Sequence, residues 1–212
     1  MIANLISIGR VILAFVSLWL FGVNFYCAAV AASLTILVIY LDSLDGYIAR
    51  KRGETSDFGA LLDITGDRIV ENIYWIFFTA MGLISFWVPV IVVTRSMMVD
   101  IVRTRAFAEG KTAFGKKTMM QSGFTRFLTA SPVSRTGYAL AKAFAFCFLG
   151  VQLALRTGID TGIVSLESGI VSCITHIAII LVYSTLTLCV IRGLPVLWDG
   201  RKYIVRKQNV TT

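Results

Sequence analysis

Hydrophobic residues run along this chain in long blocks, and polar residues gather in the connections between the blocks. The blocks have the length of helices that cross a bilayer, and they lack the alternation of half-buried strands. This pattern predicts an all-α, polytopic membrane protein with six transmembrane helices in a single domain over residues 1–212. The predicted helices cover residues 11–23, 25–41, 58–80, 86–102, 138–155 and 169–191.

Composition and charge agree with a membrane protein and predict its orientation. Hydrophobic residues make up 57% of the chain, and the formal net charge is +8. With six spans, all 20 Lys and Arg residues except Arg156 fall on the side that holds both termini. Because basic residues favour the cytoplasmic side, we expect cytoplasmic termini in a cell inner membrane. The positive charge then predicts anionic membrane lipids, and not nucleic acid, as partners.

Four carboxylates lie at the mouths of the second and third apolar segments. Asp42 and Asp45 are three residues apart, and Asp63 and Asp67 are four apart, so each pair shares one face of a helix. If the two helices pack together across the polar turn at 50–57, all four acids converge. Like charges about 5 Å apart repel by roughly 3 kcal/mol at an effective dielectric of about 20. Protonation or bound cations must therefore stabilise such a cluster.

The residues around the acids favour hard metal ions and phosphate chemistry. No Cys or His lies near the four carboxylates, so two Mg²⁺ or Mn²⁺ ions suit them better than zinc. Gly46 allows a close approach to the backbone, and Arg50, one turn later, can pair with a phosphate. Two metals, a glycine and an arginine indicate chemistry at phosphorus.

The spacing of eight residues resembles the signature of the CDP-alcohol phosphatidyltransferase family, and every position of that signature is filled. These residues are Asp42, Asp45, Gly46, Ala49, Arg50, Gly59, Asp63 and Asp67. The resemblance implies that a phosphatidyl group moves from CDP-diacylglycerol to an alcohol and that CMP leaves. It further implies that the four aspartates hold two metal ions, that Asp67 is the general base, and that the protein forms a homodimer.

The resemblance also assigns residues to the binding of the CDP-lipid. Gly46, Ala49, Arg50, Ser56 and Gly59 would shape the nucleotide pocket, with the active site facing the cytoplasm. The chain's start is similar to a short family pattern of Asn, apolar residues and Arg, with Ala3 in place of the usual proline. Asn4 is therefore expected near the lipid–nucleotide headgroup, and Arg10 completes the pattern.

The acceptor is less narrowly defined by the sequence. Arg95, Lys116 and Lys117 favour a phosphorylated alcohol, although Arg95 could equally form a salt bridge between helices. The segment 117–121 resembles the K-T-x-x-Q of glycerol-phosphate enzymes, whereas Arg68 after Asp67 resembles the inositol-phosphate branch. Glycerol 3-phosphate is the favoured acceptor, and inositol 1-phosphate or the phosphatidylglycerol of a cardiolipin synthase are alternatives.

Two other classes of function stay open at this point. A small cation transporter could use the aspartates as its ion site, but such transporters tend to have inverted repeats, and none is visible. A non-catalytic CDP-lipid-binding scaffold would need no turnover. Among the remaining polar residues, the roles of Glu71, Asp100 and His176 are undecided; His176 could serve packing or a hydrogen bond between helices.

Overall fold

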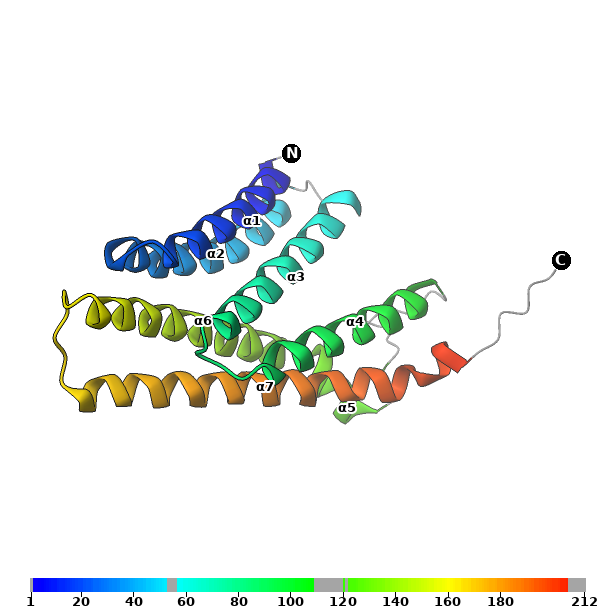
Figure 1. Ribbon diagram of the computed structural model, residues 1–212. Helices are drawn as coiled ribbons and strands as arrows, with labels where there is room; N and C mark the ends of the chain where they lie inside the picture. Colours follow the sequence, from blue (N-terminus) through cyan, green and yellow to red (C-terminus); the bar gives the residue numbers. More distant parts are fainter. Residues whose placement is uncertain (1, 53–56, 109–119, 121, 206–212) are drawn as a thin grey trace. The chain divides into compact units, whose positions relative to one another are not determined.

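The computed structural model describes residues 2–52, 57–108, 120 and 122–205, with only the backbone for residues 2–3, 42–52, 57–58, 60–61, 108, 130 and 202–205. This part of the chain forms α-helices and no strand, which confirms the all-α prediction. The helices in Figure 1 are α1 (Ile2–Phe21), α2 (Phe25–Arg52), α3 (Asp57–Ala80), α4 (Trp87–Ala108), α5 (Gly123–Ala130), α6 (Pro132–Asp160) and α7 (Ser168–Val205).

Each predicted apolar segment corresponds to one helix, with two residues of 11–23 beyond α1 and one residue of 86–102 before α4, and the larger errors lie in the polar regions. The expected turn at 50–57 is shorter, because α2 continues to Arg52. The stretch 103–135, interpreted as a loop, is partly helical: it contains the end of α4, all of α5 and the start of α6. The region after residue 191, interpreted as a polar tail, continues α7 to Val205 despite Pro195 inside the helix.

The chain divides into two compact units, which are described separately below. Unit 1 comprises residues 1–89 and 142–182, and unit 2 comprises residues 90–141 and 183–212. The four predicted metal-binding aspartates belong to unit 1, whereas Arg95 belongs to unit 2.

In unit 1, α1 packs along both α2 and α3 (Figure 1). Small buried residues, Ala14 on α1 and Ala28 and Ala31 on α2, allow the helices to approach closely. A buried hydroxyl node, formed by Ser17, Thr35 and Tyr74, joins all three helices. The Ser17 Oγ lies 3.2 Å from Thr35 Oγ1 and 3.0 Å from the Tyr74 hydroxyl, which donates to Thr35 Oγ1 at 3.2 Å.

Aromatic rings connect α3 to α6 inside the same unit. The Phe146 ring stacks on Tyr74 with centroids 5.1 Å apart and meets the edge of Trp75 at 4.7 Å. All three side chains are buried. This packing fixes one face of α3, and the acids of α3 lie toward its N-terminal end.

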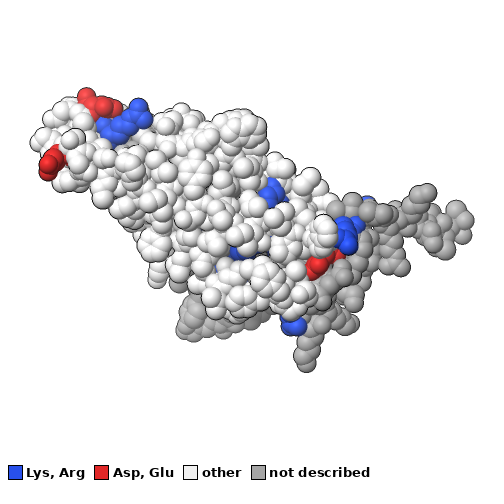
Figure 2. All heavy atoms as spheres, turned by 90° about the horizontal axis from the view of Figure 1, so that it is seen from below, with Lys and Arg blue, Asp and Glu red and all other residues white. Residues whose placement is uncertain are grey.

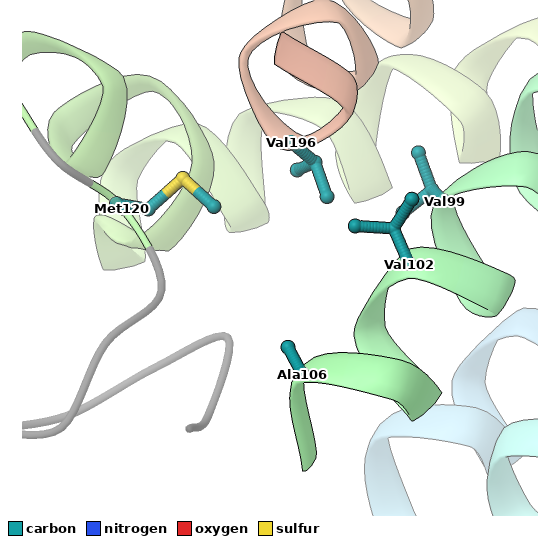
Figure 3. Packing of buried hydrophobic residues seen from close by; sticks show 5 residues of the cluster. All are labelled: Val99, Val102, Ala106, Met120 and Val196. Carbon is teal, nitrogen blue, oxygen red and sulfur yellow. The ribbon is translucent and has the colours of Figure 1, made fainter. Parts of the chain in front are cut away.

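Unit 2 has its own apolar cluster between α4 and α7. Val99, Val102 and Ala106 of α4 lie against Val196 of α7, together with Met120 (Figure 3). The Thr125 hydroxyl of α5 donates a 2.8 Å hydrogen bond to the Asp199 carboxylate of α7. The part of α7 around Val196 and Asp199 is therefore an integral part of this unit.

The exposed surface of the helices is largely apolar, as expected for helices in a bilayer. Within the described residues, three helical stretches are long and apolar enough to cross a membrane: Asn4–Phe21, Gly123–Asp160 and Ser168–Arg201. The face drawn in Figure 2 carries few charged residues, and many large aliphatic side chains are exposed, for example Ile12 and Ile180. The helices and the surface support a membrane protein, while six spans and cytoplasmic termini stay predictions.

Candidate active site

The acidic face of α3 meets a buried arginine from α1. Arg10 Nη2 lies 2.7 Å from Asp67 Oδ1 and 3.7 Å from Asp63 Oδ1, so one guanidinium faces both carboxylates. The shorter contact is an ion pair by distance, although its angles are not those of a hydrogen bond. Arg10 is only 2% exposed, whereas the side chains of Asp63 and Asp67 are each 44% exposed. The structure thus brings the two predicted acids of α3 together.

The local sequence explains why Arg10 is directed at the acids. The buried positions of α1 recur every three or four residues, which gives the helix one stripe against its neighbours; they are Ser7, Arg10, Ala14, Ser17 and Phe21. Opposite Arg10 on α3 stands Gly66, where a Cβ atom would lie 3.3 Å from Arg10 Nη2 and 3.5 Å from a Val11 methyl. The missing side chain leaves room for the guanidinium beside Asp67.

The hydroxyl node keeps Arg10 and Asp67 in register. Ser17 follows Arg10 by seven residues on α1, and Tyr74 follows Asp67 by seven on α3. Seven residues are almost two helical turns, roughly 10 Å along the axis. Arg10 and Ser17 therefore lie on one face of α1, and Asp67 and Tyr74 lie on one face of α3. The hydrogen bond between Ser17 and Tyr74 therefore aligns α1 with α3 where the ion pair forms.

A second ion-pair group lies one turn beyond Asp67. The Glu71 carboxylate accepts a 3.2 Å hydrogen bond from Lys142 Nζ of α6 and lies 3.8 Å from Arg68 Nη1. The Glu71 side chain is 5% exposed. Glu71, whose role was undecided from the sequence, thus joins α3 to α6 within unit 1.

The other predicted lipid and metal residues are described only in part. Asp42, Asp45, Gly46, Ala49 and Arg50 lie in α2, but their side chains are outside the described part of the structure, as is all of Ser56. Gly59 lies on α3 four residues before Asp63, and Asn4 lies half-buried on α1. Among the side chains that are described, no group of three or more Asp, Glu, His or Cys forms a metal cluster.

Unit 2 contains a separate group of arginines. Arg95 of α4 lies across Gly193 of α7, where a Cβ atom would lie 2.8 Å from the arginine's Cγ. Arg192 stacks over the Tyr138 ring of α6, its guanidinium carbon 5.1 Å from the ring centroid. The charges of Arg95 and Arg135 both act on Arg192, and the buried Nε atoms of Arg95 and Arg192 have no hydrogen-bond partner among the described residues.

These contacts identify residues that the sequence analysis did not select for the site. Arg10 was recognised only as part of an N-terminal pattern, and Arg192 was assigned to a tail. A usable signal existed for Arg192, because it interrupts the apolar run Cys189–Trp198 as Arg95 interrupts its own helix. Lys116 and Lys117 lie outside the described residues. His176 was expected to pack or to bond another helix, but its Nδ1 lies 2.7 Å from the Ser172 carbonyl of its own helix.

The described donors fit a divalent cation in part. Asp63 and Asp67 offer oxygen ligands on one half-exposed helix face, which is the donor chemistry that Mg²⁺ and Mn²⁺ prefer. By spacing, residues 42 and 45 continue the buried stripe of α2, formed by Ala28, Ala31, Thr35 and Val38. Residue 42 follows Thr35 of the hydroxyl node by seven residues, the same offset that separates Asp67 from Tyr74.

Comparison with known proteins agrees with this arrangement. The CDP-diacylglycerol–glycerol-3-phosphate 3-phosphatidyltransferase of Pseudomonas fluorescens is 28% identical over 166 residues, 73% of this chain and 84% of the relative. A probable phosphatidylglycerophosphate synthase of Mycobacterium tuberculosis is 26% identical over 113 residues, and the chain spans about half of its length, 54%. The archaetidylinositol phosphate synthase of Methanothermobacter thermautotrophicus is 37% identical over 71 residues, 34% of this chain and 36% of that relative.

The match to a whole family is broader than any of these pairs. The family model described as CDP-alcohol phosphatidyltransferase matches residues 1–180, which include the complete aspartate signature and Arg10. The chain therefore belongs to the CDP-alcohol phosphatidyltransferase family.

Proposed function

We propose that this protein transfers a phosphatidyl group from CDP-diacylglycerol to glycerol 3-phosphate, which makes it a phosphatidylglycerophosphate synthase. The observation that carries the proposal is the half-exposed pair Asp63 and Asp67, held on one face of α3 at the spacing of the family's signature. Family membership supports a transferase, and the relatives named for glycerol 3-phosphate support this acceptor.

The aspartates would bind the metal ions. Asp42, Asp45, Asp63 and Asp67 would hold two Mg²⁺ or Mn²⁺ ions, which when bound neutralise the pyrophosphate and polarise the attacked phosphorus. The register of α2 supports this set, because residues 42 and 45 continue its buried stripe. Asn4, Gly46, Ala49, Arg50, Ser56 and Gly59 would bind the CDP part of the lipid donor.

Asp67 would take the proton from the acceptor hydroxyl. A new bond forms between that hydroxyl oxygen and the lipid-side phosphorus, and the bond to the bridging pyrophosphate oxygen breaks, so CMP leaves with the electron pair. Asp67 can meet a soluble acceptor because 44% of its side chain is exposed while its Oδ1 is buried beside Arg10. A carboxylate near cations is a weak base, so it would act as the proton leaves in the transition state.

The arginines of unit 2 would bind the phosphate of the acceptor. Like charges gather at Arg95, Arg135 and Arg192, and a phosphate would offset their mutual repulsion. Arg95 and Arg192 have buried Nε donors that such an anion can use. Lys116 and Lys117 are further candidates from the sequence. A homodimer and a cytoplasmic active site are part of the proposal on the strength of the family resemblance alone.

The experiment is a CMP-release assay on the purified full chain with Mg²⁺ and CDP-diacylglycerol. Glycerol 3-phosphate, glycerol, inositol 1-phosphate, serine and phosphatidylglycerol are added one at a time. We expect turnover with glycerol 3-phosphate and none with glycerol, since only the former carries the phosphate. Turnover with serine alone would contradict the phosphate-binding assignment, and turnover with phosphatidylglycerol alone would favour the cardiolipin-synthase alternative over glycerol 3-phosphate. Cation flux in vesicles without any CMP release would favour a transporter.

Inositol 1-phosphate is the second candidate acceptor. Arg68 directly follows Asp67, as in the inositol-phosphate branch, and the archaeal relative is named for an inositol phosphate. The same assay separates the two candidates, because both acceptors carry a phosphate but have different alcohols.

A further inference from the structure

We propose that Arg10 is a built-in countercation, which neutralises Asp63 and Asp67 until a divalent metal ion replaces it. This inference rests on the proposed function, because it needs these aspartates to be metal ligands. It makes Arg10 a positioning residue that sets how tightly the site binds its metal.

Geometry supplies the first argument. The Arg10 guanidinium occupies the place where a cation would best balance two carboxylates, 2.7 Å from Asp67 and 3.7 Å from Asp63. The Oδ1 of Asp67 is buried on the side of Arg10, while the side chain as a whole is 44% exposed. One side of the carboxylate pair therefore faces a fixed charge within the protein, and another part is open to solutes.

The chemistry of arginine supplies the second argument. Its guanidinium stays charged under all physiological conditions, so Arg10 cannot release the aspartates by losing a proton. A metal ion on the open side of the carboxylates and the guanidinium at Oδ1 then compete for the same negative charge, and they repel each other when both are near it. Metal binding is opposed as long as Arg10 stays beside Asp67, which lowers the apparent affinity for the metal.

The ion pair of Glu71 and Lys142 offers an internal contrast. Its carboxylate is 5% exposed, lies between α3 and α6, and has no open side for a metal ion. A buried carboxylate that bonds a neighbouring helix suits a permanent structural link. The Arg10 pair joins a buried cation to half-exposed anions, which is the arrangement that an exchangeable ion requires.

The test compares the wild-type chain, Arg10→Gln and Arg10→Lys, with Arg156→Gln as the matched control. Arg156 is an exposed arginine on α6 in the same unit, so its variant loses the same charge away from the aspartates. Binding of Mn²⁺ alone to the purified protein is measured by electron paramagnetic resonance. Thermal unfolding in detergent is followed for each variant with excess EDTA and with saturating Mn²⁺.

The expected result is tighter metal binding without Arg10. Arg10→Gln should bind Mn²⁺ roughly tenfold to a hundredfold more tightly, since the charge-assisted interaction with Asp67 no longer competes. Its melting temperature should fall in EDTA and recover with Mn²⁺, so the gap between the two conditions widens. Arg10→Lys should lie between Arg10→Gln and the wild type, and Arg156→Gln should match the wild type.

Two failures can be told apart. Equal Mn²⁺ affinity in the wild type and both Arg10 variants would overturn the countercation and leave the proposed transferase intact, as would equal loss of stability with and without metal. If the wild type binds no Mn²⁺, both proposals are overturned. Should Arg10→Gln fail to fold, Arg10→Lys decides the question, because it keeps the charge but loses the planar fork that faces two carboxylates.

Discussion

The two units carry their buried and half-buried arginines in different ways. In unit 1 the buried charges of the described residues have partners of opposite sign: Arg10 pairs with Asp67, and Glu71 pairs with Lys142. In unit 2 the half-buried Arg95 and Arg192 act on each other as like charges, and Arg192 is stacked on an aromatic ring. The arginine of unit 1 is thus already compensated by an anion, whereas the arginines of unit 2 lie beside like charges.

The difference shows which charges stabilise the fold and which invite a ligand. Removing one member of a compensated pair leaves its partner in an apolar environment, and this usually destabilises a protein. Removing one of several like charges relieves repulsion, so stability should hold or improve. Loss of function without loss of stability is therefore the mark expected of the unit 2 arginines.

The largest expected effect is on catalysis in unit 1. Asp67→Asn should lower CMP release by about a thousandfold, since loss of a general base typically costs between a hundredfold and ten-thousandfold. Membrane insertion should be retained because the amide has the same size. Asp160→Asn, at the exposed end of α6, is the matched control and should turn over normally. Turnover by purified Asp67→Asn near the wild-type rate would refute the assignment of the base.

The next effect is on the stability of unit 1. Glu71→Gln should lower the free energy of unfolding by about 2 kcal/mol, because Lys142 and Arg68 lose a buried carboxylate that interacts with both. Thermal unfolding in detergent measures the change. Glu167→Gln, an exposed acid between α6 and α7, is the control and should leave stability unchanged. An unaltered melting temperature for Glu71→Gln would remove the contrast between the units.

In unit 2 the expected effect is on the acceptor only. Arg192→Gln should raise the KM for glycerol 3-phosphate by roughly tenfold, as expected for the loss of one charge-assisted hydrogen bond. The KM for CDP-diacylglycerol and the melting temperature should hold. Arg105→Gln, an exposed arginine in the last turn of α4, should behave like the wild type. A variant that loses stability and keeps its KM would make Arg192 a structural residue.

The smallest effect concerns the hydroxyl node. Tyr74→Phe should cost about 1 kcal/mol of stability, because it deletes the hydroxyl contacts to Ser17 and Thr35 without changing the ring stack on Phe146. Tyr183→Phe, exposed on α7, serves as the control. A loss equal to that of Glu71→Gln would mean that neutral hydroxyls hold unit 1 as strongly as its ion pairs.

Much of the fold could be predicted because apolar runs of this length have few other solutions. The third segment, predicted at 58–80, differs from α3 by a single residue at its start, Asp57. The end of α7 was missed because Arg192, Pro195 and Asp199 all suggest a polar tail. Within unit 2, Arg192 stacks on the Tyr138 ring, Asp199 accepts a hydrogen bond from Thr125, and α7 continues through Pro195. Tyr138 and Thr125 are far from residues 192–199 in the sequence, so a local window of sequence does not reveal these contacts.

For the site, spacing identified Asp63 and Asp67 as neighbours on one helix face, but it did not identify Arg10 as their partner. Helical periodicity relates residues within one helix, while the register between α1 and α3 is set by Ser17 and Tyr74, 57 residues apart. The grouping of Arg95, Arg135 and Arg192 could not be predicted for the same reason, because each residue comes from a different helix of unit 2.

The seven-residue offsets around the hydroxyl node have a consequence for how the gene can change in length. One codon inserted between Arg10 and Ser17 would rotate Arg10 by about 100° around α1 if Ser17 kept its place. The arginine would then leave the aspartates even though no residue had been substituted. Length variation among natural or engineered versions should therefore avoid residues 10–17, 35–42 and 67–74 and be tolerated at the connection between α6 and α7.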